Sequence, residues 1–94
     1  MKHTDIREVF SAKEYGKKET VCGWVRTARD SKNVAFIELN DGTTLKHIQV
    51  VIDKEKGIEY SDEAMKLGAS LKVVGELVEG RQGYPEINAE EIGS

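Results

Sequence analysis

The sequence has few residues that could cross-link the chain or bind a metal. Its 94 residues include one cysteine, Cys22, and two well-separated histidines, His3 and His47. A single cysteine cannot form a disulfide within the chain, which is typical of a protein from a reducing compartment. No cluster of cysteine and histidine has the spacing of metal ligands. We therefore expect a cytoplasmic protein without a metal site.

Long hydrophobic runs are also missing. No stretch approaches the roughly 18 apolar residues that a membrane span needs. The amino terminus, MKHTDIREVF, mixes acidic and basic residues where a secretory signal would have an apolar segment. We expect no membrane partner. A chain of this length forms one small domain with a modest core, so residues 1–94 are predicted to be a single domain.

An excess of positive charge is absent as well, since the formal net charge is −3. This charge disfavours a non-specific nucleic-acid binder, which is usually basic. The charge is nevertheless uneven along the chain. Residues 1–53 carry nine Lys/Arg against eight Asp/Glu, a sum of +1, whereas residues 54–94 carry five against nine, a sum of −4. On charge alone, this uneven distribution indicates an ordinary solvated surface, because soluble surfaces carry mixed charges.

No set of catalytic residues is recognisable. The sequence shows no nucleophile with an adjacent base, no acid–base pair and no glycine-rich loop that would hold phosphates. We expect the chain alone to have no enzymatic activity, no catalytic residue and no bound cofactor.

The stretch Val21–Asp53 is the most informative part of the chain. It reads as three consecutive strands separated by turn residues at SKN and NDGTT. In the second strand, Ile37 and Leu39 share one face, and Phe36 shares the opposite face with Glu38. Because side chains alternate along a strand, Phe36 is expected among polar groups rather than in the core. A large aromatic there is either minor packing or a platform for a flat ligand.

The remaining elements follow from turn and capping signals. A short helix is predicted after Thr4, its N-cap, and a second helix over about 61–67, with Ser61 as N-cap and Gly68 after its end. The first strand is long, about 19–29, and Gly23 inside it predicts a bulge or bend. Strict alternation would bury Arg29, so we expect this strand to bend or end before it.

Two further strands complete the chain, at about Ser70–Val78 and Glu86–Ile92. The order of elements is then helix, three strands, helix and two strands. This order predicts an all-β fold with little helix, the five-stranded Greek-key barrel called the OB-fold. An SH3-like barrel is the alternative, although it usually lacks a helix between its third and fourth strands.

The motif GWVRTARDSK, followed by Phe36 and by IQVV, resembles a known family. It is similar to the amino-terminal anticodon-binding domain of class II aminoacyl-tRNA synthetases of the aspartyl, asparaginyl and lysyl group, with the bacterial asparaginyl type most similar. The resemblance extends over about residues 5–92. It implies an OB-fold that spreads the anticodon bases of a tRNA over the barrel face.

The resemblance also implies roles for individual residues. Phe36 matches the family's stacking phenylalanine, Arg29 the arginine of its Arg-Asp motif, and Gln49 its third-strand glutamine. Glu86 matches a glutamate near the start of the last strand. The central anticodon base, a uridine, would stack on Phe36 and hydrogen-bond to Gln49 and Arg29. Such stacking and edge contacts are how proteins read unpaired RNA bases.

Three further basic residues are candidate phosphate contacts, and sequence does not rank them. They are Arg26, Lys32 and Lys46. His47, by contrast, is expected to be an exposed strand residue.

The resemblance implies that the partner is the anticodon stem-loop of an asparagine tRNA. The aminoacylation itself would belong to a catalytic domain outside this sequence, where ATP and Mg²⁺ would bind, in a homodimeric asparagine–tRNA ligase. Two other functions remain open at this point. One is a generic binder of single-stranded nucleic acid, and the other is a protein-interaction module that keeps the barrel but no longer binds RNA.

Overall fold

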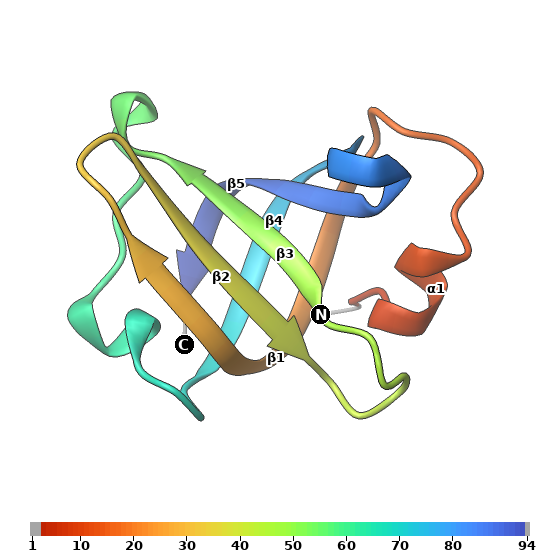
Figure 1. Ribbon diagram of the computed structural model, residues 1–94, viewed down its shortest axis with the longest axis horizontal. Coiled ribbons are helices and arrows are strands. Elements are labelled where there is room, and N and C mark those ends of the chain that lie inside the picture. The colour runs from red at the N-terminus through yellow and green to blue at the C-terminus, as the bar shows by residue number, and fades with distance from the viewer. Residues whose placement is uncertain (1–2, 94) are drawn as a thin grey trace.

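The structure, a computed structural model, describes residues 3–93, which form a closed barrel of five strands (Figure 1). The strands are β1 (Lys18–Asp30), β2 (Val34–Asn40), β3 (Ile48–Asp53), β4 (Ser70–Glu79) and β5 (Pro85–Gly93). One α-helix, α1 (Ile6–Phe10), precedes the barrel. Three short 3-10 segments lie between the later strands: η1 (Lys54–Lys56), η2 (Asp62–Met65) and η3 (Arg81–Gly83).

The order of the strands around the barrel is β1-β2-β3-β5-β4. The first three strands form an antiparallel meander, β5 runs parallel to β3, and β4 pairs antiparallel with both β5 and β1. A meander of three strands closed by a pair of later strands is the arrangement of the OB-fold. The predicted fold class is confirmed.

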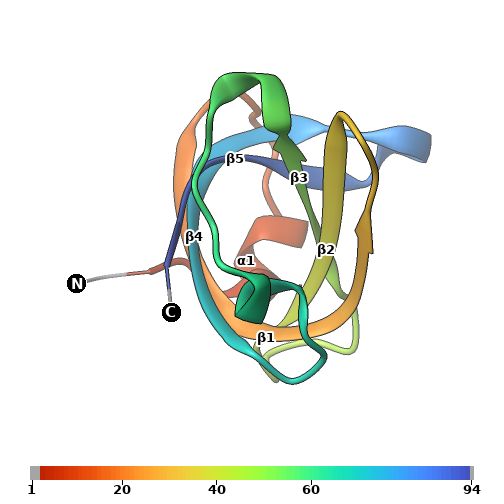
Figure 2. The same ribbon diagram turned by 90° about the vertical axis from the view of Figure 1, so that its left-hand side faces the viewer.

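The interior of the barrel is filled by the apolar faces that the alternation predicts. Ile37 of β2 and Val50 of β3 are fully buried. The two ends of the barrel are covered by helical segments, as Figure 2 shows with α1 lying across the far end. α1 contributes the buried side chains of Ile6 and Val9 to the core, and η2 contributes Ala64. The outer faces of the strands therefore remain available for binding.

A bulge in β1 decides where Arg29 points. The pairing of β1 with β2 shifts between Val25 and Thr27, so that Arg26 is an extra residue in the ladder. One inserted residue moves every later side chain to the opposite face. Beyond the bulge Arg29 therefore lies on the outer face, directly opposite Phe36. The prediction that β1 bends or ends before Arg29 is half right, because the strand bulges and continues to Asp30.

No bulge lies at Gly23, since the pairing is regular there and the bulge of β1 is at Arg26. Gly23 is needed for another reason. A Cβ atom on this residue would lie 2.7 Å from the backbone oxygen of Asn40, closer than carbon and oxygen can approach. The glycine thus allows the backbones of β1 and β2 to meet at the end of the hairpin.

The segment between β3 and β4 differs in type from the helix predicted over 61–67. It contains only the 3-10 segment η2, and the Ser61 side chain makes no capping hydrogen bond. The chain is drawn back to the barrel soon after η2, because the Gly68 N–H donates to the Val25 carbonyl at 2.8 Å. Gly68 does adopt the left-handed φ of 84° that suits its predicted place after a helical turn.

The helix α1 is capped from a distant loop, not by Thr4 as predicted. Its N-cap is Asp5, whose side chain forms no capping bond, and the Ile6 N–H donates instead to Asp41 Oδ2 at 2.8 Å. Partial burial tends to raise the pKa of Asp41. Hydrogen bonds from Ile6 and Thr43 outweigh this effect and hold the pKa below its ordinary value. Asp41 therefore anchors α1 to the loop between β2 and β3.

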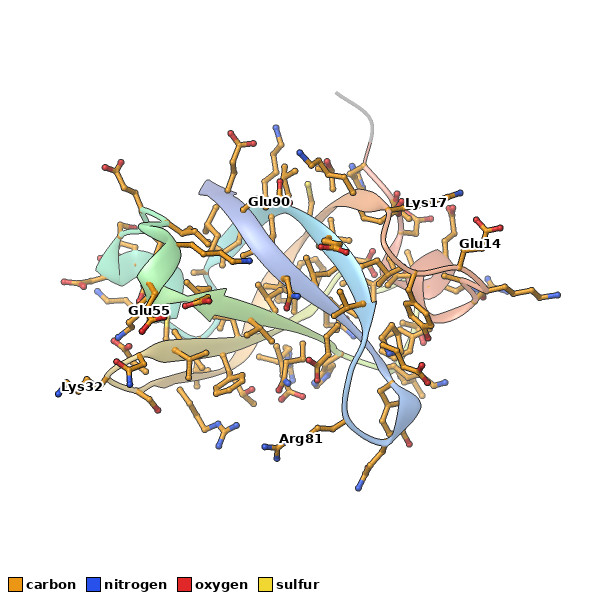
Figure 3. The ribbon with its side chains drawn as sticks, turned by 90° about the horizontal axis from the view of Figure 1, so that it is seen from above. Glu14, Lys17, Lys32, Glu55, Arg81 and Glu90 are labelled. Carbon is orange, nitrogen blue, oxygen red and sulfur yellow. The ribbon has the colours of Figure 1, made fainter. Side chains whose placement is uncertain are left out.

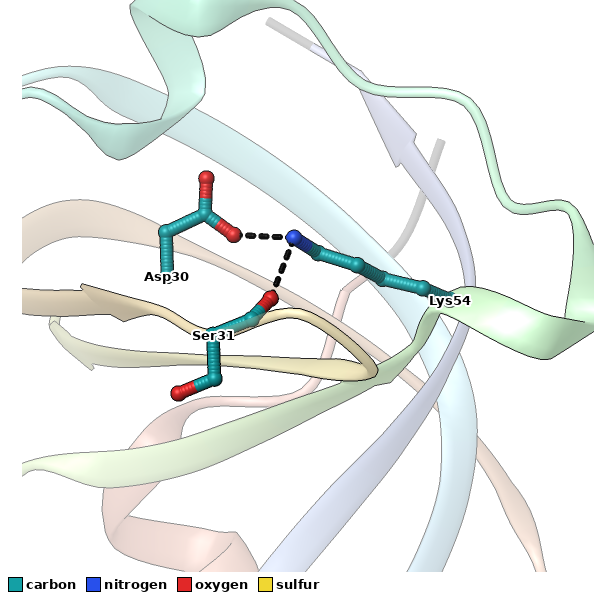
Figure 4. Close-up of polar contacts among 3 residues, drawn as sticks. All are labelled: Asp30, Ser31 and Lys54. Atoms are coloured by element: carbon teal, nitrogen blue, oxygen red, sulfur yellow. Dashed lines mark hydrogen bonds and ion pairs between the residues drawn. The ribbon is translucent and has the colours of Figure 1, made fainter.

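A lysine fixes the turn between β1 and β2. As Figure 4 shows, the Lys54 ammonium donates to the Asp30 carboxylate and, at 2.5 Å, to the Ser31 carbonyl. The hydrogen bond to Asp30 raises the pKa of Lys54, so the Lys54 ammonium stays charged at neutral pH. It holds the end of β1 next to the start of β2, which is where Arg29 and Phe36 face each other.

No helix among the described residues is long and apolar enough to cross a membrane. Within the same part of the chain, no group of three or more His, Cys, Asp or Glu side chains is placed to hold a metal ion.

Candidate nucleic-acid interface

A large cavity lies on the outer face of β2 and β3. The turn η3 and the end of α1 lie on the same side of the barrel (Figure 1). Its volume is about 660 Å³. The lining residues come from five stretches of the chain, and they are Phe10, Arg29, Phe36, Glu38, Lys46, His47, Gln49, Arg81, Gln82, Tyr84, Pro85 and Glu86. Five of the seven residues predicted from sequence are therefore brought together in one place.

Phe36 and Arg29 form the first contact pair in this cavity. They are direct cross-strand neighbours on β2 and β1, and the Arg29 guanidinium carbon lies 4.9 Å from the centre of the Phe36 ring. A guanidinium over an aromatic face is a favourable cation–π contact. The ring is half-buried and outside the hydrophobic core. It is thus a flat aromatic surface open to a ligand once Arg29 moves.

Gln49 and Glu86 form the second pair. They are neighbours on the parallel strands β3 and β5, and Gln49 Nε2 donates to Glu86 Oε2 at 2.9 Å. Gln49 uses one of its two amide hydrogens in this bond, so its second hydrogen and its carbonyl oxygen remain for other partners. On the other side of Gln49 is Glu38 of β2, whose carboxylate accepts a hydrogen bond of 2.6 Å from the Thr27 hydroxyl. Strand pairing therefore fixes these polar groups side by side.

The turn η3 shapes the edge of the cavity next to Glu86. The Gly80 N–H donates to the Tyr84 carbonyl at 2.7 Å, and the Tyr84 N–H donates to the Arg81 carbonyl at 3.1 Å. Gln82 in this turn has a φ of 60°, unusual for a residue with a side chain. This hydrogen-bonded turn holds Arg81 and Tyr84 at the rim, and Tyr84 is 57% exposed.

Gly80 leaves the space that the Glu86 side chain occupies. A Cβ atom at Gly80 would lie 2.1 Å from Cδ and 2.4 Å from Oε2 of Glu86. The backbone of Gly80 is extended, with φ −94° and ψ −156°. Its backbone conformation therefore does not require a glycine at this position. Its missing side chain instead allows the Glu86 carboxylate to fold against the turn and reach Gln49.

The side chains that line the cavity carry a small excess of positive charge, although the whole chain is negatively charged. Three cationic side chains line it, from Arg29, Lys46 and Arg81, against two carboxylates, from Glu38 and Glu86. The chain as a whole has a formal net charge of −3. The cations are exposed at the rim and the carboxylates are half-buried on the strands. An extended anion with polar planar groups fits this arrangement.

Two of the predicted residues lie elsewhere. Arg26 lines a separate shallow hollow with Asn40 and the loop between β2 and β3. Lys32 is exposed in the turn between β1 and β2 and does not line the large cavity. In Figure 3 it points away from the side of the molecule where Arg81 lies. Of the three candidate phosphate contacts, the structure places only Lys46 in the cavity.

Sequence reasoning missed several lining residues. His47 was expected to be an exposed strand residue, but it precedes β3, is half-buried and lines the cavity. Phe10, the last residue of α1, is not among the residues that the sequence singles out. Arg81 and Tyr84 lie in a segment, 79–85, that the sequence predicts as a turn-rich loop and a candidate contact for the third base, without singling out either residue. The signal available for Tyr84 was its position directly before Pro85, which starts a strand, since a residue there is held in extended conformation.

Comparisons with known proteins agree with this geometry. Residues 19–93 match a family described as OB-fold nucleic acid binding domains and named for the tRNA anticodon. The matched range contains almost all of β1 and the whole of the other four strands. The chain belongs to this family. The family resemblance of the GWVR motif is thereby confirmed, and the cavity lies on an anticodon-binding type of OB domain.

The relatives of this OB domain include whole ligases. The asparagine–tRNA ligase of Azobacteroides pseudotrichonymphae is 42% identical over 94 residues, which cover 98% of this chain and 20% of the ligase. That of Acetivibrio thermocellus is 46% identical over 83 residues, 84% of this chain and 18% of the ligase. The chain thus spans about a fifth of the length of the curated relatives it matches.

A solved structure supports the fold. The asparaginyl-tRNA synthetase of Pyrococcus horikoshii, complexed with asparaginyl-adenylate, superposes with a TM-score of 0.79. The superposition covers 99% of this chain and 22% of the synthetase, at 22% sequence identity.

Proposed function

We propose that this OB domain binds the anticodon loop of an asparagine tRNA and serves as the anticodon-binding part of a longer asparagine–tRNA ligase. The single observation that carries this proposal is the convergence of Phe36, Arg29, Gln49 and Glu86 on one cavity. These are the residues that the sequence resemblance singled out for base stacking and base reading. The identity to asparagine–tRNA ligases over most of the chain supports the choice of tRNA.

The central base of the anticodon, a uridine, stacks on the Phe36 ring. In the free protein Arg29 covers this ring, so the guanidinium moves aside when the base enters. It is then free to donate to an oxygen of the uracil or to the neighbouring phosphate. Gln49 is close to the same position and offers its amide to the edge of the base. One aromatic face and two hydrogen-bonding side chains thus act on a single nucleotide.

The third base lies against Glu86 and the turn η3. The Glu86 carboxylate accepts hydrogen bonds from a base edge, and Arg81 in the turn donates to one. Lys46 at the other end of the cavity contacts the phosphate backbone. The domain holds no ATP or Mg²⁺ in this proposal, because aminoacylation takes place in the catalytic part of the ligase. The OB domain positions the tRNA for that reaction.

The proposal is tested by titrating the domain with an anticodon stem-loop that carries GUU. The control is the same stem-loop with three abasic nucleotides in place of the anticodon. We expect the GUU loop to bind at least tenfold more tightly, since base stacking and edge contacts are lost in the control. Equal binding of the two loops would indicate a generic binder of the phosphate backbone. Absence of binding to either loop would contradict any role in RNA recognition.

Gly80→Ala provides a test of the contact between Gln49 and Glu86. The new methyl group displaces the Glu86 side chain and breaks its bond with Gln49, whose net worth is about 0.5–1.5 kcal/mol. We expect the affinity for the GUU stem-loop to fall by about 2- to 12-fold. The stability of the fold should change by less than about 1 kcal/mol, because Ala accepts this extended backbone.

The measurements are a binding titration and urea unfolding. The matched control is Gly93→Ala, because a Cβ atom there meets no atom within 4 Å. The control should leave both affinity and stability unchanged. If Gly80→Ala bound the GUU loop as tightly as the wild type, Glu86 would have no part in recognition in its present conformation.

A further inference from the structure

The three side chains proposed to hold the central base come from three different strands. Arg29 lies on β1, Phe36 on β2 and Gln49 on β3. Arg29 and Phe36 are cross-strand partners, whereas Gln49 is reached from Phe36 across the ladder of β2 and β3. Their joint action on one nucleotide requires the strands to keep their relative positions, because a displacement of about 1 Å weakens such an arrangement. A residue that ties the three strands together therefore affects base reading without touching RNA.

Lys54 is such a residue. It follows β3 directly, as the first residue of η1, and Figures 1 and 2 both show η1 beside the turn between β1 and β2. Its ammonium donates to the Asp30 carboxylate at the end of β1 and, at 2.5 Å, to the Ser31 carbonyl (Figure 4). Its backbone N–H donates to the carbonyl of Asn33, directly before β2, at 3.1 Å. One residue thus joins the ends of β1, β2 and β3.

The lysine in the Lys54 ion pair is more shielded from water than the lysines in the other three ion pairs of the described residues. The Lys54 side chain is 29% exposed, whereas those of Lys17, Lys18 and Lys66 are 69%, 66% and 64% exposed. A well-exposed ion pair contributes little, because water and salt screen it and both side chains lose freedom. The Lys54 pair is screened less and is supplemented by the bond to the Ser31 carbonyl. It is therefore suited to hold a fixed geometry.

Lys54 acts close to the pair that reads the base, although it does not line the cavity itself. Asp30, its partner, is the residue after Arg29. The pair of Arg29 and Phe36 is the next cross-strand pair after that of Asp30 and Ala35, which is adjacent to the turn. The ends of elements open most easily, because few contacts hold them. The bonds of Lys54 hold this end of the hairpin against β3.

We infer that Lys54 is a positioning residue for recognition of the central anticodon base. By fixing Asp30 and the turn, it keeps Arg29 and Phe36 at a constant position relative to Gln49. In the free protein Arg29 covers the Phe36 ring, and its guanidinium moves aside when the base enters. Lys54 holds the backbone at Arg29 in place during this movement. The inference rests on the proposed function, because it concerns the same bound uridine.

The test is the ratio of the affinities for the GUU and GCU stem-loops, measured for the wild type and for Lys54→Met. Met has a side chain of similar length, but it carries no charge and donates no hydrogen bond. We expect Lys54→Met to narrow the ratio by about 2- to 30-fold, the range for a residue that acts through its neighbours. A loss of folded protein would lower both affinities equally and leave the ratio unchanged. The ratio therefore separates positioning from stability.

Two further variants control for charge and for the geometry of the contact. Lys18→Met removes the same charge from another ion pair, formed with Glu90 at 2.9 Å. Lys18 is the first residue of β1, at the opposite end of that strand from Asp30, and it does not line the cavity. Lys54→Arg keeps the charge and can donate to both the Asp30 carboxylate and the Ser31 carbonyl. Both variants should keep the wild-type ratio.

Each result decides for or against the positioning role. A wild-type ratio in Lys54→Met disproves it while anticodon binding stands, whatever urea unfolding shows for stability. An equally narrow ratio in Lys18→Met would attribute the effect to charge alone, and one in Lys54→Arg would show that the ion pair is not responsible; either result overturns the inference. If the wild type binds the GUU loop no more tightly than the loop with the abasic anticodon, the proposed function itself is wrong. A ratio narrowed in Lys54→Met alone supports the inference.

Discussion

Phe36→Ala is expected to weaken binding of the GUU anticodon stem-loop by about 1–3 kcal/mol, or 5- to 150-fold. The loss is large because the side chain supplies the whole stacking face for the central base. The fold should survive, since Phe36 is half-buried on the outer face and does not belong to the hydrophobic core. Titration with the labelled stem-loop measures the affinity, and urea unfolding measures the stability.

A second substitution separates stacking from hydrophobic contact. Phe36→Leu keeps an apolar side chain of similar reach but has no flat π-face, so it should lose most of the same affinity. Tyr15→Ala is the matched aromatic control, because Tyr15 is 40% exposed and lies outside the cavity. If Phe36→Ala unfolded the domain, as the loss of a core aromatic would, Phe36 would be a packing residue and not a platform.

The barrel could be predicted from the sequence because buried and exposed side chains alternate along its strands. Ile37 in β2 and Val50 in β3 lie inward as the alternation predicts. Arg29 is where simple alternation fails. Its outward direction depends on the bulge between Val25 and Thr27, and no single residue in the sequence marks that bulge. Only the pairing of β1 with β2, a tertiary contact, determines the change of face.

The candidate site could be predicted where strands form it, and less well where loops do. Phe36 stands out because an aromatic ring breaks the polar character of its strand face, whereas Gln49 is singled out only by the family resemblance. Arg81 and Phe10 do not stand out, because their contribution depends on how a turn and a short helix pack against the barrel. The capping of α1 by Asp41, 35 residues distant from Ile6, illustrates the same limit. Sequence periodicity carries no information about such contacts.

The second base should be read more stringently than the third. Uracil presents two oxygens on either side of one N–H, so Arg29 can donate to an oxygen and Gln49 can serve the rest of the edge. Cytosine at this position turns an amino group toward the same edge, where it meets the donors of Arg29. The mismatch therefore affects two side chains at once. Each unsatisfied pair costs about 1–3 kcal/mol.

At the third base, the Glu86 carboxylate discriminates only weakly between uracil and cytosine. A carboxylate only accepts hydrogen bonds, and it can accept from the N–H of uracil or from the amino group of cytosine. Uracil has a carbonyl oxygen where cytosine has its amino group, so a preference for uracil requires a hydrogen-bond donor to that oxygen. The donor at that end of the cavity is Arg81 of η3. The Arg81 side chain is exposed and its rotamer is not fixed by any strand neighbour. Its contribution to selectivity should be small.

We therefore expect a stem-loop with GCU to lose more affinity than one with GUC, relative to GUU. Titration of the three loops under one salt condition measures the order, because phosphate contacts are common to all and cancel in the ratios. Glu86→Gln is the matched variant, since its oxygen still accepts from Gln49 while its amide adds a donor for uracil. It should widen the gap between GUU and GUC and leave the ratio of GUU to GCU unchanged. If GUC lost as much as GCU in the wild type, Arg81 would be an ordered reader of the third base, and η3 would contribute to tRNA selection as strongly as the strands.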